Sequence, residues 1–219
     1  VYGNGIVVLV GDFCLARALE TVANTGELPV VQSLAACVTE MAEGEVAQLQ
    51  NAGNAEATVD DYLGVIDRKT AALIAWCARI GGVHGPALDG PLARYGRALG
   101  RAFQIADDIL DCAVDESVAG KSVGHDLMEG KLTLPVLLAC DADARVRDRL
   151  RAELGEHGVS PTATAEILRL VRDAGGVERA RAEAAKLADD AMAELDVLPP
   201  SPFREALRDL ARLSVHRVT

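Results

Sequence analysis

Aromatic residues are scarce in this chain: they make up 3% of its 219 residues, with one Trp, three Tyr and three Phe. Strands of β-sandwiches and barrels rely on aromatic and β-branched residues, whereas Ala and Leu, which are abundant here, favour helices. The sequence also shows no hairpin signal, internal repeat or low-complexity linker. It therefore predicts an all-α protein, with residues 1–219 forming a single helical domain.

The chain also lacks paired cysteines and long apolar runs. Its five cysteines contain no C-x-x-C pair, which is typical of buried thiols in a reducing compartment. No stretch approaches the roughly 18 consecutive apolar residues of a membrane span. The opening residues do not have the pattern of a signal peptide. We therefore expect a cytoplasmic protein that is not an integral membrane protein.

Positive charge is in deficit, since 22 Lys and Arg face 33 Asp and Glu and the formal net charge is −11. This charge argues against nucleic acid as a partner. It also repels anionic substrates, so a site for such a substrate would need local lysines and metal ions.

The chain starts without Met, at Val1, and its first Met is Met41. The segment from Ile6 to Ala16 is apolar on nearly every side, which predicts a helix enclosed by other helices. From both features we expect that residues preceding Val1 belong to the protein.

Acidic residues gather in the stretch Arg101–Cys112, which is predicted to be helical. Gln104, Asp107, Asp108 and Asp111 have the spacing of one helix face. Carboxylates on one stripe raise each other's pKa unless a cation lies among them. Mg²⁺ takes one or two protein carboxylates together with waters and substrate phosphates. The pattern indicates a magnesium–diphosphate site, and an acidic, solvated helix face is the alternative.

Three lysines are candidates for binding an anion. Lys69 lies in a helix that we expect to begin at a capping box of Thr58 and Asp61. Apolar residues flank Lys69 at helical spacing, so it needs an anion, unless its side chain snorkels to solvent. Lys121 and Lys131 belong to a stretch rich in glycine and charge that follows the aspartates, where solvated surface is the alternative. Glu45 and Gln48 could face a site, but a polar helix edge is the favoured interpretation.

The ordered set of short motifs is more specific than any one of them. It comprises Lys69-Thr70-Ala71, Phe103-Gln104, Asp107-Asp108-Ile109-Leu110-Asp111, Gly120-Lys121, Gly124-x-Asp126 and Glu129-Gly130-Lys131-Leu132-Thr133-Leu134-Pro135. In this set the chain resembles the trans-polyprenyl diphosphate synthase family, over essentially all its residues and over the C-terminal two-thirds of that family's domain. The resemblance implies an isoprenoid-synthase helical bundle with a central cavity, usually a homodimer.

The resemblance also implies a reaction and its residues. Isopentenyl diphosphate is condensed with an allylic diphosphate, with Mg²⁺ drawing off the allylic diphosphate. Asp107, Asp108 and Asp111 match the family's second aspartate-rich motif and would bind Mg²⁺. Lys69, Lys121 and Lys131 match its diphosphate-binding lysines, and Thr70 and Gln104 match positions near the allylic diphosphate. Lys69, Asp107 and Lys121 would be the catalytic residues. The sequence of residues 124–135 is more similar to that of the medium- and long-chain members, which favours medium- or long-chain products.

The sequence departs from the family's pattern in one feature. The family's first aspartate-rich motif, and the arginine pair just after it, are not in this sequence. We therefore expect the 219-residue chain alone to be inactive and the intact protein to be a magnesium-dependent prenyltransferase. The alternative is a noncatalytic subunit of a heteromeric prenyl diphosphate synthase. A terpene cyclase is less favoured, because those enzymes usually carry an Asn/Ser/Glu metal motif.

Overall fold

The structure is a computed structural model that describes residues 3–82, 85–113, 123–155 and 158–216. Internal contacts divide the chain into two units, Val1–Thr39 and Glu40–Thr219, which are considered separately below. Within the described residues the regular elements are helices, apart from one isolated β-bridge between Gly155 and Gly158. The all-α class predicted from the sequence is confirmed. None of the helices described is long and apolar enough to cross a membrane.

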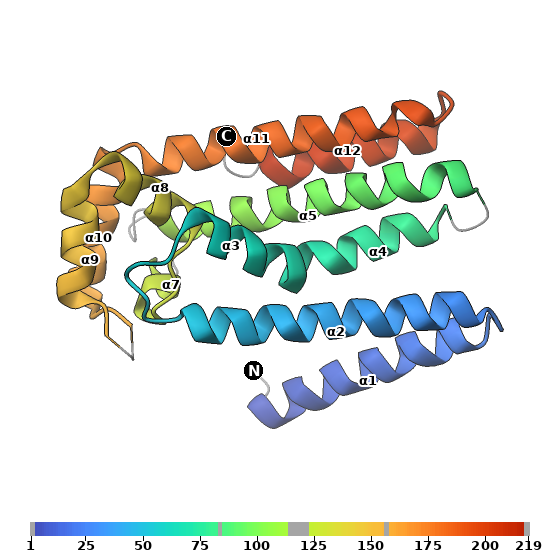
Figure 1. The fold of residues 1–219 in the computed structure, drawn as a ribbon, viewed down its shortest axis with the longest axis horizontal. Coiled ribbons are helices and arrows are strands. Elements are labelled where there is room, and N and C mark those ends of the chain that lie inside the picture. The colour runs from blue at the N-terminus through green and yellow to red at the C-terminus, as the bar shows by residue number, and fades with distance from the viewer. Residues whose placement is uncertain (1–2, 83–84, 114–122, 156–157, 217–219) are drawn as a thin grey trace. The chain divides into compact units, whose positions relative to one another are not determined.

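The first unit contains α1 (Asn4–Ala23) and the start of α2 (Leu28–Asn51), which continues into the second unit (Figure 1). No residue of α1 is buried, and Val7 and Phe13 are 62% and 65% exposed. The apolar sequence predicted an enclosed helix, and the described part of the chain does not enclose it.

In the second unit, a helical run from Val59 to Ile80 follows α2. The expected capping box is confirmed, because Thr58 Oγ1 accepts from the Asp61 amide at 3.1 Å and Asp61 Oδ2 accepts from the Thr58 amide at 2.9 Å. The sequence predicted one uninterrupted α-helix over this run. The structure corrects this, because a π-helical turn, η1 (Asp67–Ala71), separates α3 (Val59–Ile66) from α4 (Ala72–Ile80).

The remaining helices are organised around one long helix, α5 (Pro86–Ala113), which packs against α4 and α11 along its length. Figure 1 shows α4, α5, α11 and α12 running beside one another. The other elements are α7 (His125–Met128), α8 (Leu134–Ala142), α9 (Ala144–Glu153), α10 (Pro161–Asp173), α11 (Gly176–Glu194), η2 (Leu195–Val197) and α12 (Pro202–His216).

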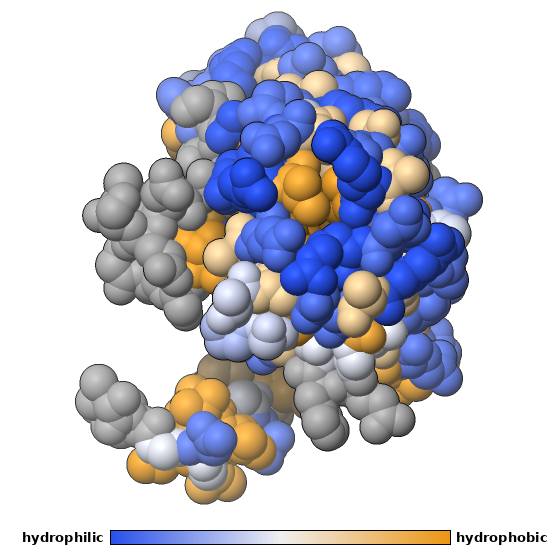
Figure 2. All heavy atoms as spheres, turned by 90° about the vertical axis from the view of Figure 1, so that its left-hand side faces the viewer, coloured by the Kyte–Doolittle hydropathy of each residue, from blue (hydrophilic) through white to orange (hydrophobic). Residues whose placement is uncertain are grey.

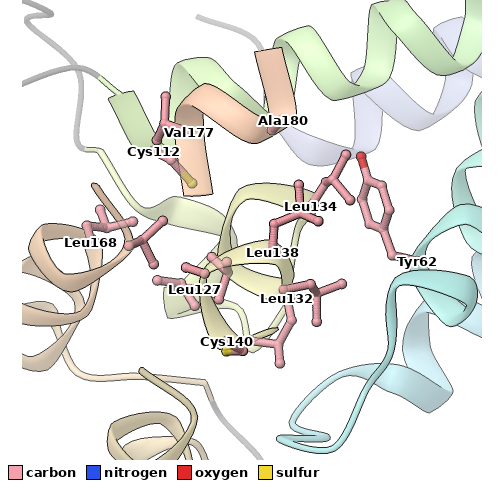
Figure 3. Packing of buried hydrophobic residues seen from close by; sticks show 14 of the residues in the cluster. Tyr62, Cys112, Leu127, Leu132, Leu134, Leu138, Cys140, Leu168, Val177 and Ala180 are labelled. Atoms are coloured by element: carbon pink, nitrogen blue, oxygen red, sulfur yellow. The ribbon is translucent and has the colours of Figure 1, made fainter. Parts of the chain in front are cut away.

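The larger core cluster of the second unit surrounds α8. Every residue from Leu134 to Cys140 is buried, which explains why this short helix can be apolar on all sides. Figure 3 shows side chains from α7, α10 and α11 around it, with Tyr62 reaching in from α3. In contrast, α9 buries only Val146 and Leu150, and hydrophilic residues cover most of the face where α9 and α10 lie (Figure 2).

Two glycines let α5 approach the helical run 59–80 closely. A Cβ atom at Gly96 would lie 2.6 Å from the Ala75 Cα, and one at Gly100 would lie 2.6 Å from the Ala71 Cα. Both clashes are with backbone atoms, which cannot rotate away as the end of a side chain can. The position of η1 against α5 therefore requires a residue without a side chain at position 100.

Substitution Gly100→Ala should lower the free energy of unfolding by about 1–3 kcal/mol, because α5 and η1 must move apart to admit the methyl group. The control is Gly64→Ala in α3, where the nearest atom to a new Cβ would be the Arg68 Nη1 at 3.7 Å. There, removing a helical glycine should change stability by about 1 kcal/mol or less, in the stabilising direction. Urea denaturation of both variants measures the difference, and equal stabilities would contradict the assignment of Gly100 as a close-approach position.

Candidate functional site

A cavity of about 220 Å³ lies within the second unit, between the end of α2, the helical run 59–80, α5 and the segment after α7. Its ionisable and amide side chains include Lys69, Gln104, Asp107, Asp108, Asp126 and Lys131. Apolar side chains complete much of the wall, namely Ala52, Ala57, Val65, Ile66 and Leu132. The cavity thus combines carboxylates, ammonium groups and an apolar lining, as an amphiphilic phosphorylated substrate requires.

The predicted polar face of α5 is present, and a hydrogen-bonded chain runs across it. Asp108 is 5% exposed and accepts hydrogen bonds from the Tyr62 hydroxyl at 2.6 Å and from Gln104 Nε2 at 2.9 Å. Gln104 Oε1 in turn accepts from Thr70 Oγ1 at 2.9 Å. Thr70 and Gln104, which the family resemblance places near the allylic diphosphate, are therefore in direct contact.

Burial makes the negative charge of this cavity costly. It raises the pKa of Asp108 to about 7, although the hydrogen bonds from Tyr62 and Gln104 act in the opposite direction. Burial, followed by the nearby Asp111 carboxylate, also raises the pKa of Asp126. Burial and the Asp108 charge raise the pKa of Tyr62 well above its ordinary value, so Tyr62 stays a neutral donor. Carboxylates with raised pKa values favour cations nearby.

Asp111, the third predicted metal ligand, is engaged elsewhere. Its two carboxylate oxygens accept from the backbone amides of His125 at 3.1 Å and Asp126 at 3.0 Å, at the positively polarised start of α7. Asp111 is not among the residues that line the cavity. It instead orients the segment that carries Asp126, which does line it.

The cavity supplies some of the ligands that a metal ion needs. No group of three or more His, Cys, Asp or Glu side chains is placed to hold a metal ion among the residues described. Mg²⁺ does not need such a group, because it commonly uses one or two protein carboxylates and completes its shell with waters and phosphates. Asp107 and Asp108 supply hard oxygen donors at the cavity wall, so the residues present fit a magnesium ion shared with a phosphorylated substrate.

Both described lysines of the predicted site line the cavity and already have anionic or polar partners. Lys69 Nζ lies 2.7 Å from Gln48 Oε1 and 3.2 Å from Glu45 Oε1. Lys131 forms an ion pair with Glu129. The structure therefore places Glu45 and Gln48 at Lys69, where sequence reasoning favoured an uninvolved polar edge. Lys121, the third predicted lysine, falls outside the described residues.

The sequence predicted no role at the site for Tyr62 or for Asp126. Tyr62 is buried, and its hydroxyl contacts Asp108 from a helix 46 residues away in sequence. A helix-face pattern cannot reveal such a contact, because it reports periodicity within one helix. The signal for Asp126 was the motif Gly124-x-Asp126, which the sequence contains but to which no role had been assigned.

Comparison with known proteins places these features in a family. The sequence pattern of the family described as polyprenyl synthetase matches residues 1–171. The octaprenyl diphosphate synthase of Escherichia coli (strain K12) is 39% identical over 224 residues, covering 99% of this chain and 68% of that protein. The all-trans-nonaprenyl-diphosphate synthase of Rhodobacter capsulatus is 34% identical over 220 residues, covering 99% of this chain and 67% of that protein.

Solved structures agree with the fold. A polyprenyl synthase from Caulobacter crescentus, complexed with calcium and isoprenyl diphosphate, superposes with a TM-score of 0.89 at 35% identity, covering 99% of this chain and 67% of that one. A decaprenyl diphosphate synthase from Rhodobacter capsulatus superposes with a TM-score of 0.87 at 38% identity, covering 97% of this chain and 66% of that one. The chain thus spans about two thirds of the length of these relatives.

These matches confirm the isoprenoid-synthase type of helical fold and the class of enzyme predicted from the motifs. The relatives are named for products of medium and long chain length, the same range that residues 124–135 favoured. The chain belongs to the polyprenyl synthetase family, a family of divalent-metal-dependent prenyltransferases.

Proposed function

We propose that the protein condenses isopentenyl diphosphate with an allylic diphosphate to give a trans-polyprenyl diphosphate of medium or long chain, using Mg²⁺. The observation that carries this proposal is the cavity in which Asp107, Asp108, Lys69 and Lys131 share one space with an apolar wall. Diphosphates need cations, and a prenyl chain needs apolar contact, so one substrate can satisfy both parts of the lining.

The acidic residues would hold the metal ion. We assign Asp107, Asp108 and Asp111 as carboxylate ligands of Mg²⁺. Asp111 also orients the segment that carries Asp126. When bound, Mg²⁺ offsets the charge of the departing diphosphate. Tyr62 and Gln104 would keep the Asp108 carboxylate oriented through the two hydrogen bonds that they donate.

The lysines would hold the diphosphate by exchanging partners. Lys69 leaves Glu45, and Lys131 leaves Glu129, when substrate phosphate oxygens arrive. Thr70 follows Lys69 in η1 and donates a hydrogen bond to Gln104, and both would orient the same group. We assign Lys121 the same role as the other two lysines. Preorganised cations are effective where negative charge develops on a leaving group. The apolar wall, including Val65 and Leu132, excludes water from the carbocationic prenyl group.

We further propose a cytoplasmic homodimer that forms one helical domain per chain. The apolar, exposed surface of α1 supports association, because exposed apolar patches of this kind mark interaction surfaces. The five cysteines are all free, as is usual in a reducing compartment.

Substitution Asp107→Ala should lower kcat by orders of magnitude without unfolding the protein, because it removes a carboxylate that faces the cavity. The full-length protein is incubated with farnesyl diphosphate, isopentenyl diphosphate and Mg²⁺, and prenyl diphosphates are separated by chain length. Asp190→Ala on the exposed side of α11 is the control and should retain activity. Failure of the unmodified protein to extend any allylic primer would reject the proposed function.

The two partners of one ion pair should shift diphosphate affinity in opposite directions. Lys69→Gln removes a cation and should weaken binding of inorganic pyrophosphate, in the presence of Mg²⁺, by about tenfold or more. Glu45→Gln removes the competing carboxylate and should leave affinity unchanged or tighter. Isothermal titration calorimetry measures both constants, and a parallel loss in both variants would mean that the pair matters only for structure.

The association proposal is tested by light scattering coupled to gel filtration. The full-length protein should have twice the mass of one chain, and Val7→Glu with Phe13→Glu on α1 should shift it toward the monomer, because two charges would enter an apolar contact. A monomer at micromolar concentration before mutation would contradict the homodimer.

A further inference from the structure

The π-helical turn η1 carries two residues of the site, Lys69 and Thr70, and it is joined to α5 by an ionic contact outside the cavity. Asp67, the first residue of the turn, accepts from Arg97 Nη1 and from Arg101 Nε, each at 2.7 Å and each through a different carboxylate oxygen. Arg97 also contacts Glu40 of α2 at 3.2 Å. Asp67 thus receives two charge-assisted hydrogen bonds from consecutive turns of one helix.

Asp67 also closes the turn through its backbone. Its carbonyl accepts the amide of Ala72, five residues later, which is the hydrogen bond that makes the turn wider than an α-helical one. One residue therefore supplies both the bond that closes the π-turn and the side chain that fixes it to α5. Lys69 and Thr70 lie inside the loop that this bond encloses.

The turn is confined on two further sides by glycines. A Cβ at Gly44 of α2 would lie 2.6 Å from the Lys69 backbone nitrogen, and one at Gly100 of α5 would lie 2.6 Å from the Ala71 Cα. The backbone of η1 therefore lies in close contact with both helices. The Asp67 hydrogen bonds fix how the turn is oriented against α5. Single π-turns in α-helices occur frequently at functional sites.

We infer that Asp67 is a positioning residue. Through its contacts with Arg97 and Arg101 it holds η1 in place, so that Lys69 and Thr70 point to the diphosphate. The inference rests on the proposed function, because the position of Lys69 and Thr70 matters for catalysis only if they bind the diphosphate. Although burial would raise the pKa of Asp67, the Arg101 hydrogen bond and charge and the nearby Arg97 hold it below its usual value. The Asp67 side chain is thus an anion throughout the neutral range.

A comparison of Asp67→Asn with Asp89→Asn tests the inference. Asp89 of α5 pairs with Arg79 of α4 at 2.7 Å, so it also joins α5 to the helical run 59–80, but it lies outside the cavity lining. Asp67→Asn should weaken binding of inorganic pyrophosphate with Mg²⁺ by about tenfold, because a charged acceptor of two hydrogen bonds is lost. Asp89→Asn should leave it unchanged, and Asp67→Glu should restore most of the affinity.

Hydrogen exchange of the backbone amides in residues 67–72 provides a second measurement that needs no ligand. Exchange should accelerate in Asp67→Asn and not in Asp89→Asn. If Asp67→Asn does not fold, Arg101→Gln, which leaves the Arg97 contact, takes its place. Unchanged exchange in residues 67–72, or a drop in Tm with unchanged pyrophosphate affinity, would overturn the inference. An unmodified protein that binds no pyrophosphate would contradict the proposed function, while exchange would still decide the role of Asp67.

Discussion

A carboxylate buried in a cavity governs the chemistry of this site. Asp108 is almost fully removed from solvent, and its hydrogen bonds to Tyr62 and Gln104 stabilise its anion only in part, so its pKa remains raised to about 7. The nearby Asp107 and Asp126 add negative charge. Burial of this kind disfavours negative charge, and a cation bound nearby would offset that cost, as the proposed function requires.

The helix α5 joins this chemistry to the scaffold. One face of α5 carries Gln104, Asp107 and Asp108 to the cavity, and other faces pack against α4 and α11. Gly100 and Arg101 lie one turn earlier and fix the distance to η1, which carries the opposing Lys69. The separation between carboxylates and ammonium groups is therefore set by backbone packing, and not by flexible side chains alone.

The net charge of −11 would repel a diphosphate substrate, so the side chains next to the cavity have to offset that repulsion. Each lysine of the cavity is accompanied by a glutamate, Lys69 by Glu45 and Lys131 by Glu129. In the proposed function, a phosphate would replace the carboxylate in each of these ion pairs. The relatives are named as synthases of long prenyl diphosphates, and one was solved with calcium and isoprenyl diphosphate, which agrees with a site that handles such substrates together with divalent cations.

The helical class and the family follow from the sequence alone, because both rest on composition and on short motifs within single segments. Thr58 and Ser160 could be identified as caps because their partners lie three residues away. The folded structure alone shows which polar groups meet: Tyr62 contacts Asp108, Glu45 and Gln48 contact Lys69, and Asp67 contacts two arginines of α5. It also shows that Asp111 orients α7 rather than lining the cavity, and that a π-turn interrupts the helix at Lys69. The physical reason is that helical spacing reports which residues share a face, whereas the partner of each buried charge depends on how separate helices pack.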